Sequence, residues 1–200
     1  MFPTLIRRIF LIAWVTLAGT PALATTLQKL TFEEMVERSA LIIQGEVVSV
    51  RPAESDNLLY TRVLFKVDDV LKGENPGEFI ELDFLGGEES GARVSVSGQD
   101  IPPKGERGFY FIENPDTRSV NPLTGWSQGH FRILTDPKGI ETLETDIQVD
   151  IVEISDNKDA VLANKLRNMK FSRTLVDQAF YSPVTPDELR DAVHGFLDGE

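Results

Sequence analysis

Apolar and polar residues alternate along much of the chain between positions 41 and 154, and this period of two is typical of half-buried β-strands. Residues 41–50 begin as a continuous apolar run and settle into alternation, whereas residues 59–71 place Val63, Phe65 and Val67 on one side. The same pattern predicts shorter strands at residues 79–85, 92–96, 108–112, 130–134, 140–143 and 148–154.

Turn-forming residues separate these predicted strands, and no helical period lies between them. A turn is expected at residues 51–57, a loop at residues 72–77, and a tight turn at residues 136–139, where Pro and Gly occupy favoured positions. Closely spaced strands joined in this way favour an antiparallel barrel or sandwich. We therefore predict an all-β, antiparallel barrel with helical appendages.

Two capping boxes mark predicted helices. Thr31 and Glu34 have the spacing at which a hydroxyl and a carboxylate satisfy the free N–H groups of a first helical turn, and a short amphipathic helix follows them. Thr185 and Glu188 repeat the motif, with Pro186 at the first helical position. An apolar stripe then predicts a terminal helix that packs on the barrel or on a partner; it comprises Leu189, Ala192, Val193, Phe196 and Leu197. A further helix is expected at residues 159–169.

The first 24 residues have the pattern of a cleaved signal peptide. Arg7 and Arg8 precede an apolar stretch over residues 9–17, and small residues precede a cleavage site after Ala24. The stretch is shorter than the roughly 20 residues that span a bilayer. We expect an exported protein, periplasmic or secreted, with no membrane span in the mature chain. The expected parts are a signal peptide (1–24), a barrel domain (25–155) and a helical appendage (156–200).

Charge and composition exclude several classes of function. The 200 residues carry 32 acidic and 20 basic side chains, a net charge of −12, and removal of the predicted signal peptide takes away two arginines and makes it −14. A nucleic-acid partner is therefore disfavoured, because binding a phosphate backbone needs a basic face. The chain has no cysteine, which excludes disulfides, thiolate zinc sites and thiol catalysis.

Several short motifs between residues 31 and 134 resemble known secreted proteins. The segments "ERSALIIQGEVVSV" and "YTRVLFKVDDVLKG" resemble the opening of netrin-like domains, the OB-fold barrels that include tissue inhibitors of metalloproteinases. The chain is also similar to a group of exported bacterial proteins with "FLGG", "VSG", "GER" and "GWSQGHFRI". The resemblance implies an OB-like barrel. The animal inhibitors reach the protease zinc with an N-terminal cysteine, so that mechanism does not carry over to this cysteine-free chain.

The motif GWSQG over residues 125–129 fits the G-x-S-x-G pattern of a nucleophile elbow around Ser127. An elbow needs a helix after the serine, whereas a predicted strand follows here. The histidine partner would be His130 or His194. We favour a glycine-flanked turn in which Trp126 covers one end of the barrel.

Metal and cofactor chemistry has little support in the sequence. The two histidines are 64 positions apart, and no cysteine accompanies them in a zinc-like spacing. Oxygen ligands gather in two loops, Glu113, Asn114, Asp116 and Asn121 in one and Asp156 and Asp159 in the other. Neither loop has the spacing and central glycine of a calcium loop. We expect solvated acidic turns, with no metal and no cofactor.

These observations favour an exported, non-enzymatic binding module whose partner is a protein or peptide, such as an extracellular protease or an envelope component. Aromatic anchors and glycine-rich loops suit recognition. The candidate contact residues are Phe84, Leu85, Gly86, Gly87, Trp126 and His130. An envelope serine hydrolase that uses Ser127 and an envelope structural or interaction protein remain as alternatives.

Overall fold

The computed structural model describes residues 29–55, 57–89, 91–145 and 184–199. The predicted signal peptide, the predicted strand at residues 148–154 and the predicted helix at residues 159–169 lie outside these residues.

The described chain is rich in strands, and all its strand pairs are antiparallel. One sheet has the order β3-β2-β1-β6-β7-β8, and β4 pairs with β5 in a second, two-stranded sheet. The bounds are β1 (Leu41–Ser55), β2 (Leu58–Lys72), β3 (Phe79–Leu85), β4 (Gly87–Glu89), β5 (Ala92–Val94), β6 (Arg107–Ile112), β7 (His130–Thr135) and β8 (Glu141–Glu144). The prediction of an antiparallel, strand-rich fold is confirmed.

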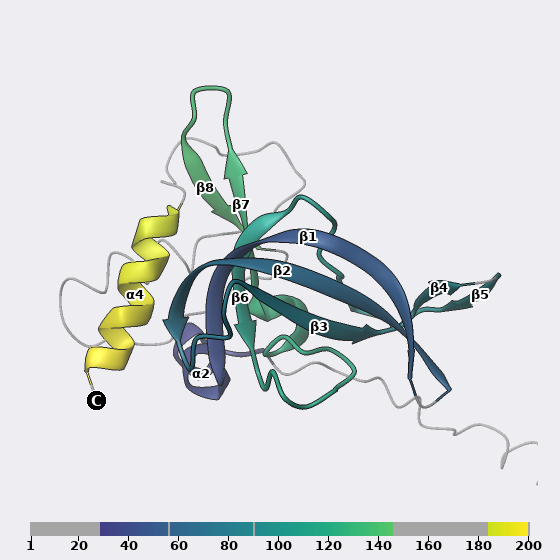
Figure 1. Ribbon diagram of the computed structural model, residues 1–200. Helices are drawn as coiled ribbons and strands as arrows, with labels where there is room; N and C mark the ends of the chain where they lie inside the picture. Colours follow the sequence, from purple (N-terminus) through teal and green to yellow (C-terminus); the bar gives the residue numbers. More distant parts are fainter. Residues whose placement is uncertain (1–28, 56, 90, 146–183, 200) are drawn as a thin grey trace, which may run out of the picture.

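The large sheet curves without closing within the described residues. β1 and β2 form a long bent ribbon, and β3 and β8 are the two edges of the sheet (Figure 1). No pairing between these two edge strands occurs in the described part of the chain. The sheet is therefore established, whereas a closed OB-like barrel is not.

The ribbon of β1 and β2 is longer than the sequence pattern predicted. β1 continues through Pro52 to Ser55, so the expected turn at residues 51–57 is mostly strand. Proline is tolerated here because, among the described residues, the part of β1 around Pro52 pairs with β2 alone. The prediction of a turn failed because a proline inside an alternating run cannot be distinguished from a strand end by sequence alone.

Both predicted capping boxes are present. Thr31 starts α2 (Phe32–Arg38): its hydroxyl accepts from the Glu34 amide at 3.1 Å, and the Glu34 carboxylate accepts from the Thr31 amide at 2.9 Å. Thr185 and Glu188 cap α4 (Pro186–Asp198) in the same way. None of the helices in the described ranges is long and apolar enough to cross a membrane.

Two clusters of buried side chains make up the core. The first joins α2 and α4 to the sheet, and includes Phe32, Phe111, Phe131, Leu189 and Val193. The second lies within the bend of β1, β2, β3 and β6, and includes Ile43, Phe65, Leu82, Phe84 and Tyr110. The terminal helix therefore packs on this chain's own sheet. The helices cover one end of the sheet, and the β4–β5 hairpin projects at the other (Figure 1).

Candidate functional site

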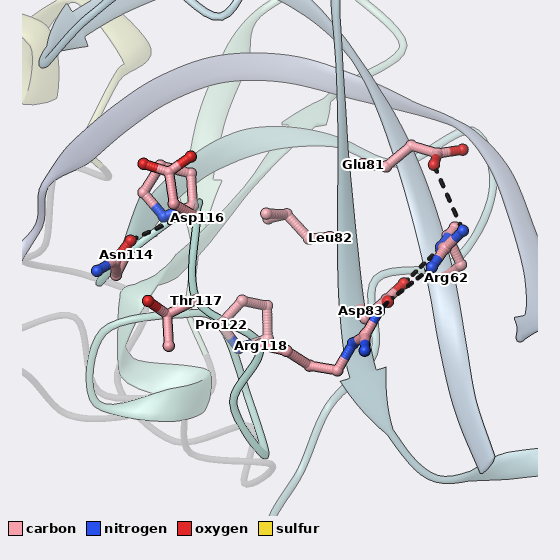
Figure 2. Close-up of a pocket in the computed structure, with 10 residues that line it drawn as sticks. Arg62, Glu81, Leu82, Asp83, Asn114, Asp116, Thr117, Arg118 and Pro122 are labelled. Carbon is pink, nitrogen blue, oxygen red and sulfur yellow. Dashed lines mark hydrogen bonds and ion pairs between the residues drawn. The ribbon is translucent and has the colours of Figure 1, made fainter. Parts of the chain in front are cut away.

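A cleft of about 410 Å³ runs between the edge strand β3 and the long loop that joins β6 to β7. The loop is held at three points: the Leu85 amide donates to the Val120 carbonyl, the Glu113 amide donates to the Pro122 carbonyl, and Ile112 bridges to Leu123. The lining residues are Arg62, Glu81, Leu82, Asp83, Asn114, Pro115, Asp116, Thr117, Arg118 and Pro122. The strand and the loop face each other across the opening (Figure 2).

Arg62, Asp83 and Arg118 form one side of this cleft, which we call the charged wall, and Asp83 lies at its centre. It pairs directly with Arg62 in the β2–β3 register, and Arg62 donates two hydrogen bonds to its carboxylate, at 2.6 and 2.8 Å (Figure 2). Arg118 donates a third at 3.1 Å from the loop. Only 11% of the Asp83 side chain is exposed, whereas the Arg118 side chain is 37% exposed.

The two arginines favour the ionised form of the Asp83 carboxyl group. The hydrogen bond from Arg62 lowers the pKa of Asp83 below its ordinary value, burial opposes the shift, and Arg118 adds to it. The same hydrogen bond raises the pKa of Arg62. Asp83 therefore stays ionised near neutral pH, and its lone pairs are already directed at two arginines. It suits a rigid, charge-balanced wall better than a general acid.

Further contacts fasten the loop to the ribbon of β1 and β2. Arg118 donates to the Ser55 hydroxyl at 2.7 Å, and its guanidinium lies 5.2 Å from the centre of the Tyr60 ring. On the outer face, Arg51 donates to Glu81 at 2.8 Å. Three strands and the loop are thus cross-linked around β3 by ionic hydrogen bonds.

The loop wall of the cleft has little sign of a metal site. The Asp116 amide donates to Oδ1 of Asn114 at 2.9 Å, and Oδ1 of the buried Asn121 accepts from the Leu123 amide at 2.9 Å. These oxygens therefore stabilise turns of the loop itself. Among the described residues, no group of three or more acidic or histidine side chains is placed to hold a metal ion.

Leu85, Gly86 and Gly87 form a sharp bend at the end of β3, which we call the glycine corner. Gly86 donates its amide to the Leu59 carbonyl at 2.8 Å and accepts from the Thr61 hydroxyl at 2.8 Å. Both glycines have positive φ, 106° and 143°. A Cβ on Gly87 would approach the Thr61 hydroxyl to 2.7 Å, so this conformation and contact require glycine. The corner lines a second cleft of about 260 Å³.

Three exposed apolar side chains belong to segments that contact the glycine corner. Leu58, Val94 and Val120 are 49%, 43% and 41% exposed. They come from three separate segments, each tied to the corner by a backbone contact: Leu59 to Gly86, Val94 to Gly87, and Val120 to Leu85. We call Leu58, Val94 and Val120 the corner patch.

Two of the predicted contact residues lie in the interior instead. Phe84 is fully buried in the core within the bend, and His130 is 2% exposed. The His130 ring stacks on Tyr110 with centroids 5.1 Å apart, and its Nε2 lies 2.8 Å from Oε1 of Glu106. Neither side chain offers surface to a partner. Phe84 follows the alternation of β3, whose even-numbered residues face inward.

Trp126 lies apart from the glycine corner. Gly125 and Trp126 both have positive φ, and η1 (Trp126–Gly129) is a single 3-10 turn. The Leu30 amide donates to Oε1 of Gln128 at 2.8 Å, which places this turn at the start of α2. The corner lies beside the far end of the β1–β2 ribbon. The candidate contact residues are therefore divided between two ends of the molecule.

Ser127 does not have the surroundings of a nucleophile elbow. β7 follows η1 directly, so no α-helix begins behind the serine. His130 contacts Glu106 and Tyr110, and within the described ranges no hydrogen bond joins Ser127 to either histidine.

The charged wall was missed in the sequence. Arg62 and Asp83 each occupy a polar position of an alternating strand, which is the position expected of any solvated residue. Their pairing depends on the register of β2 and β3, and the contribution of Arg118 depends on a loop that returns from β6. Opposite charges on two consecutive predicted strands were the available signal.

The chain was compared with protein-family models, with curated proteins and with solved structures, and none of the three comparisons finds a match. The function is therefore inferred from the cleft, the glycine corner and the residues around them.

Proposed function

We propose that this protein is an exported, non-enzymatic binding module that contacts a protein or peptide partner at the corner patch. The observation that carries the proposal is that the three segments carrying the exposed residues Leu58, Val94 and Val120 meet at one backbone corner. Single exposed apolar residues are ordinary on protein surfaces, whereas a cluster beside a cleft is typical of an interaction site.

The corner is well suited to recognition because it is rigid. The Gly86 amide donates to the Leu59 carbonyl of β2, Gly87 pairs with Val94 of β5, and Arg118 ties the neighbouring loop to Ser55 and Asp83. A surface that is already ordered loses little conformational entropy when a partner binds. The net charge of −12 favours a protein or peptide over a nucleic acid.

The proposal includes export after cleavage of residues 1–24 and an OB-like barrel. The strand order and the strong curvature of β1 and β2 are compatible with a partly open OB barrel, a fold that binds ligands on its strands and loops. The cysteine-dependent inhibition of metalloproteinases is not part of the proposal, because the chain has no cysteine.

The experiment is a capture from the native exported fraction with the mature chain as bait. Replacing Leu58, Val94 and Val120 together by serine should abolish capture of a specific partner while leaving the fold intact, because all three side chains are exposed.

The matched control replaces Leu134 and Ile140 by serine. These side chains are at least as exposed as most of the corner patch, at 47% and 55%, but lie on the β7–β8 hairpin. This variant should capture the partner as the wild type does. Equal capture by the corner-patch variant, checked for folding by circular dichroism, would place the contact elsewhere.

A further inference from the structure

β3 has one edge that is free of backbone pairing over most of its length. In an antiparallel ladder, alternate residues direct both their N–H and C=O groups to the same neighbour. Glu78 and Gly86 bond to β2, whereas Leu85 bonds outward to Val120. Even-numbered positions therefore face β2, and the backbone groups of Phe79, Glu81 and Asp83 face away from it.

The free edge of β3 borders the cleft, because Glu81 and Asp83 line it. Among the described residues, no hydrogen bond is made to the outward amides or carbonyls of Phe79, Glu81 and Asp83. The bond from Leu85 to Val120 closes the edge at one end, and the exposed Phe79 ring lies at the other. The cleft of about 410 Å³ separates this edge from the loop. Such an edge is a template for another strand.

We propose that an extended segment of the partner adds to the free edge of β3 as an additional strand, and that this segment is basic. The inference rests on the proposed function and specifies its binding mode. Main-chain hydrogen bonds to Phe79, Glu81 and Asp83 supply the pairing, as in other cases of strand addition. The loop over the cleft limits the added strand to a short segment.

The charge of the cleft indicates which kind of partner segment binds there. Glu81 and Asp83 are matched by arginines, but Asp116, which also lines the cleft, makes no ion pair within the described part of the chain. With a whole-chain charge of −12, the cleft favours a segment with lysine or arginine. A second copy of this chain would bring the same acidic edge against itself and is disfavoured.

Replacing Glu81 by proline tests the proposed strand addition directly. Glu81→Pro removes an outward amide while leaving the β2 ladder intact, a position where edge strands tolerate proline. Glu81→Ala is the matched control, because it removes the same carboxylate and keeps the amide. The probe is a peptide of alternating lysine and valine. A version N-methylated at two neighbouring central residues keeps the charge and blocks backbone pairing.

The lysine–valine peptide should bind the wild type, and it should bind Glu81→Pro about tenfold more weakly than Glu81→Ala, the size expected for loss of a backbone hydrogen bond. The N-methylated peptide should bind the wild type about as weakly as the unmodified peptide binds Glu81→Pro. In the wild type, the peptide should slow hydrogen exchange at the Glu81 and Asp83 amides, a readout that does not depend on any variant.

Three results would overturn the strand addition: no binding of the lysine–valine peptide, equal binding by the two Glu81 variants, or unchanged exchange at the Glu81 and Asp83 amides. The capture experiment separates this failure from failure of the proposed function. A partner captured equally by wild type and Glu81→Pro refutes strand addition and leaves the binding module standing, whereas loss of all specific capture refutes the function itself.

Discussion

Asp83 shows how one residue can organise the edge of a sheet. It is a mostly buried carboxylate that receives hydrogen bonds from Arg62 on β2 and Arg118 on the loop. Removing one partner from such a group leaves the others without compensation, and this loss is larger than the net gain of an exposed ion pair. Asp83 therefore contributes to stability and to the position of the loop.

Asp83→Asn should lower the free energy of unfolding at neutral pH by about 1.5–3 kcal/mol, the range for hydrogen bonds to charged groups. Because the folded pKa of Asp83 lies below its ordinary value near 3.8, its contribution is complete above that value and disappears as the pH falls through the folded pKa. The difference in free energy of unfolding between Asp83→Asn and the wild type should therefore become smaller at acidic pH. Urea denaturation at several pH values measures it.

Glu88→Gln is the control for that series, because Glu88 is an exposed carboxylate with no ion pair among the described residues. It should leave stability at neutral pH nearly unchanged. An Asp83→Asn gap that stays constant from neutral to strongly acidic pH would show that the carboxylate charge is not the cause.

At the scale of elements, α4 depends on its N-terminal cap and on two buried apolar residues. The Thr185 hydroxyl accepts from the Glu188 amide at 3.3 Å, and Leu189 and Val193 lie in the core beneath the helix. Arg190 reaches across to Oε1 of Gln44 on β1 at 2.6 Å. The helix is thus joined to the sheet by both apolar and polar contacts.

Thr185→Ala should lower the free energy of unfolding by about 0.5–2 kcal/mol, because the Glu188 amide loses its acceptor. Thr185→Ser keeps the hydroxyl and should retain most of the stability. Thermal unfolding followed by circular dichroism compares the two variants. Equal loss in both would mean that the threonine methyl group, and not the cap, stabilises the helix.

Elements with a local signal were predicted well. The strand at residues 79–85 and the two capped helices were predicted because period and capping boxes are properties of neighbouring residues. Pro52 inside β1 was read as a turn, because sequence alone does not reveal that, among the described residues, this part of the strand pairs with β2 alone. The charged wall was not predicted, since it requires the register of β2 on β3 and the return of a distant loop.

At the scale of the whole molecule, the helices cover one end and the glycine corner forms the other. The predicted contact residues separated accordingly, with Leu85, Gly86 and Gly87 at the corner and Trp126 near α2. The corner patch, the cleft and the free edge of β3 lie close together along the β3 side of the sheet. We propose that the partner binds on this side.

The most direct test is photo-cross-linking in cells that produce the protein. A photoreactive side chain at Val120, in the corner patch, should form a specific cross-link to a partner protein, whereas the same group at Ile140 on the β7–β8 hairpin should not. Both positions are exposed, so the comparison depends on location alone. A specific cross-link at Ile140 with none at Val120 would contradict the account.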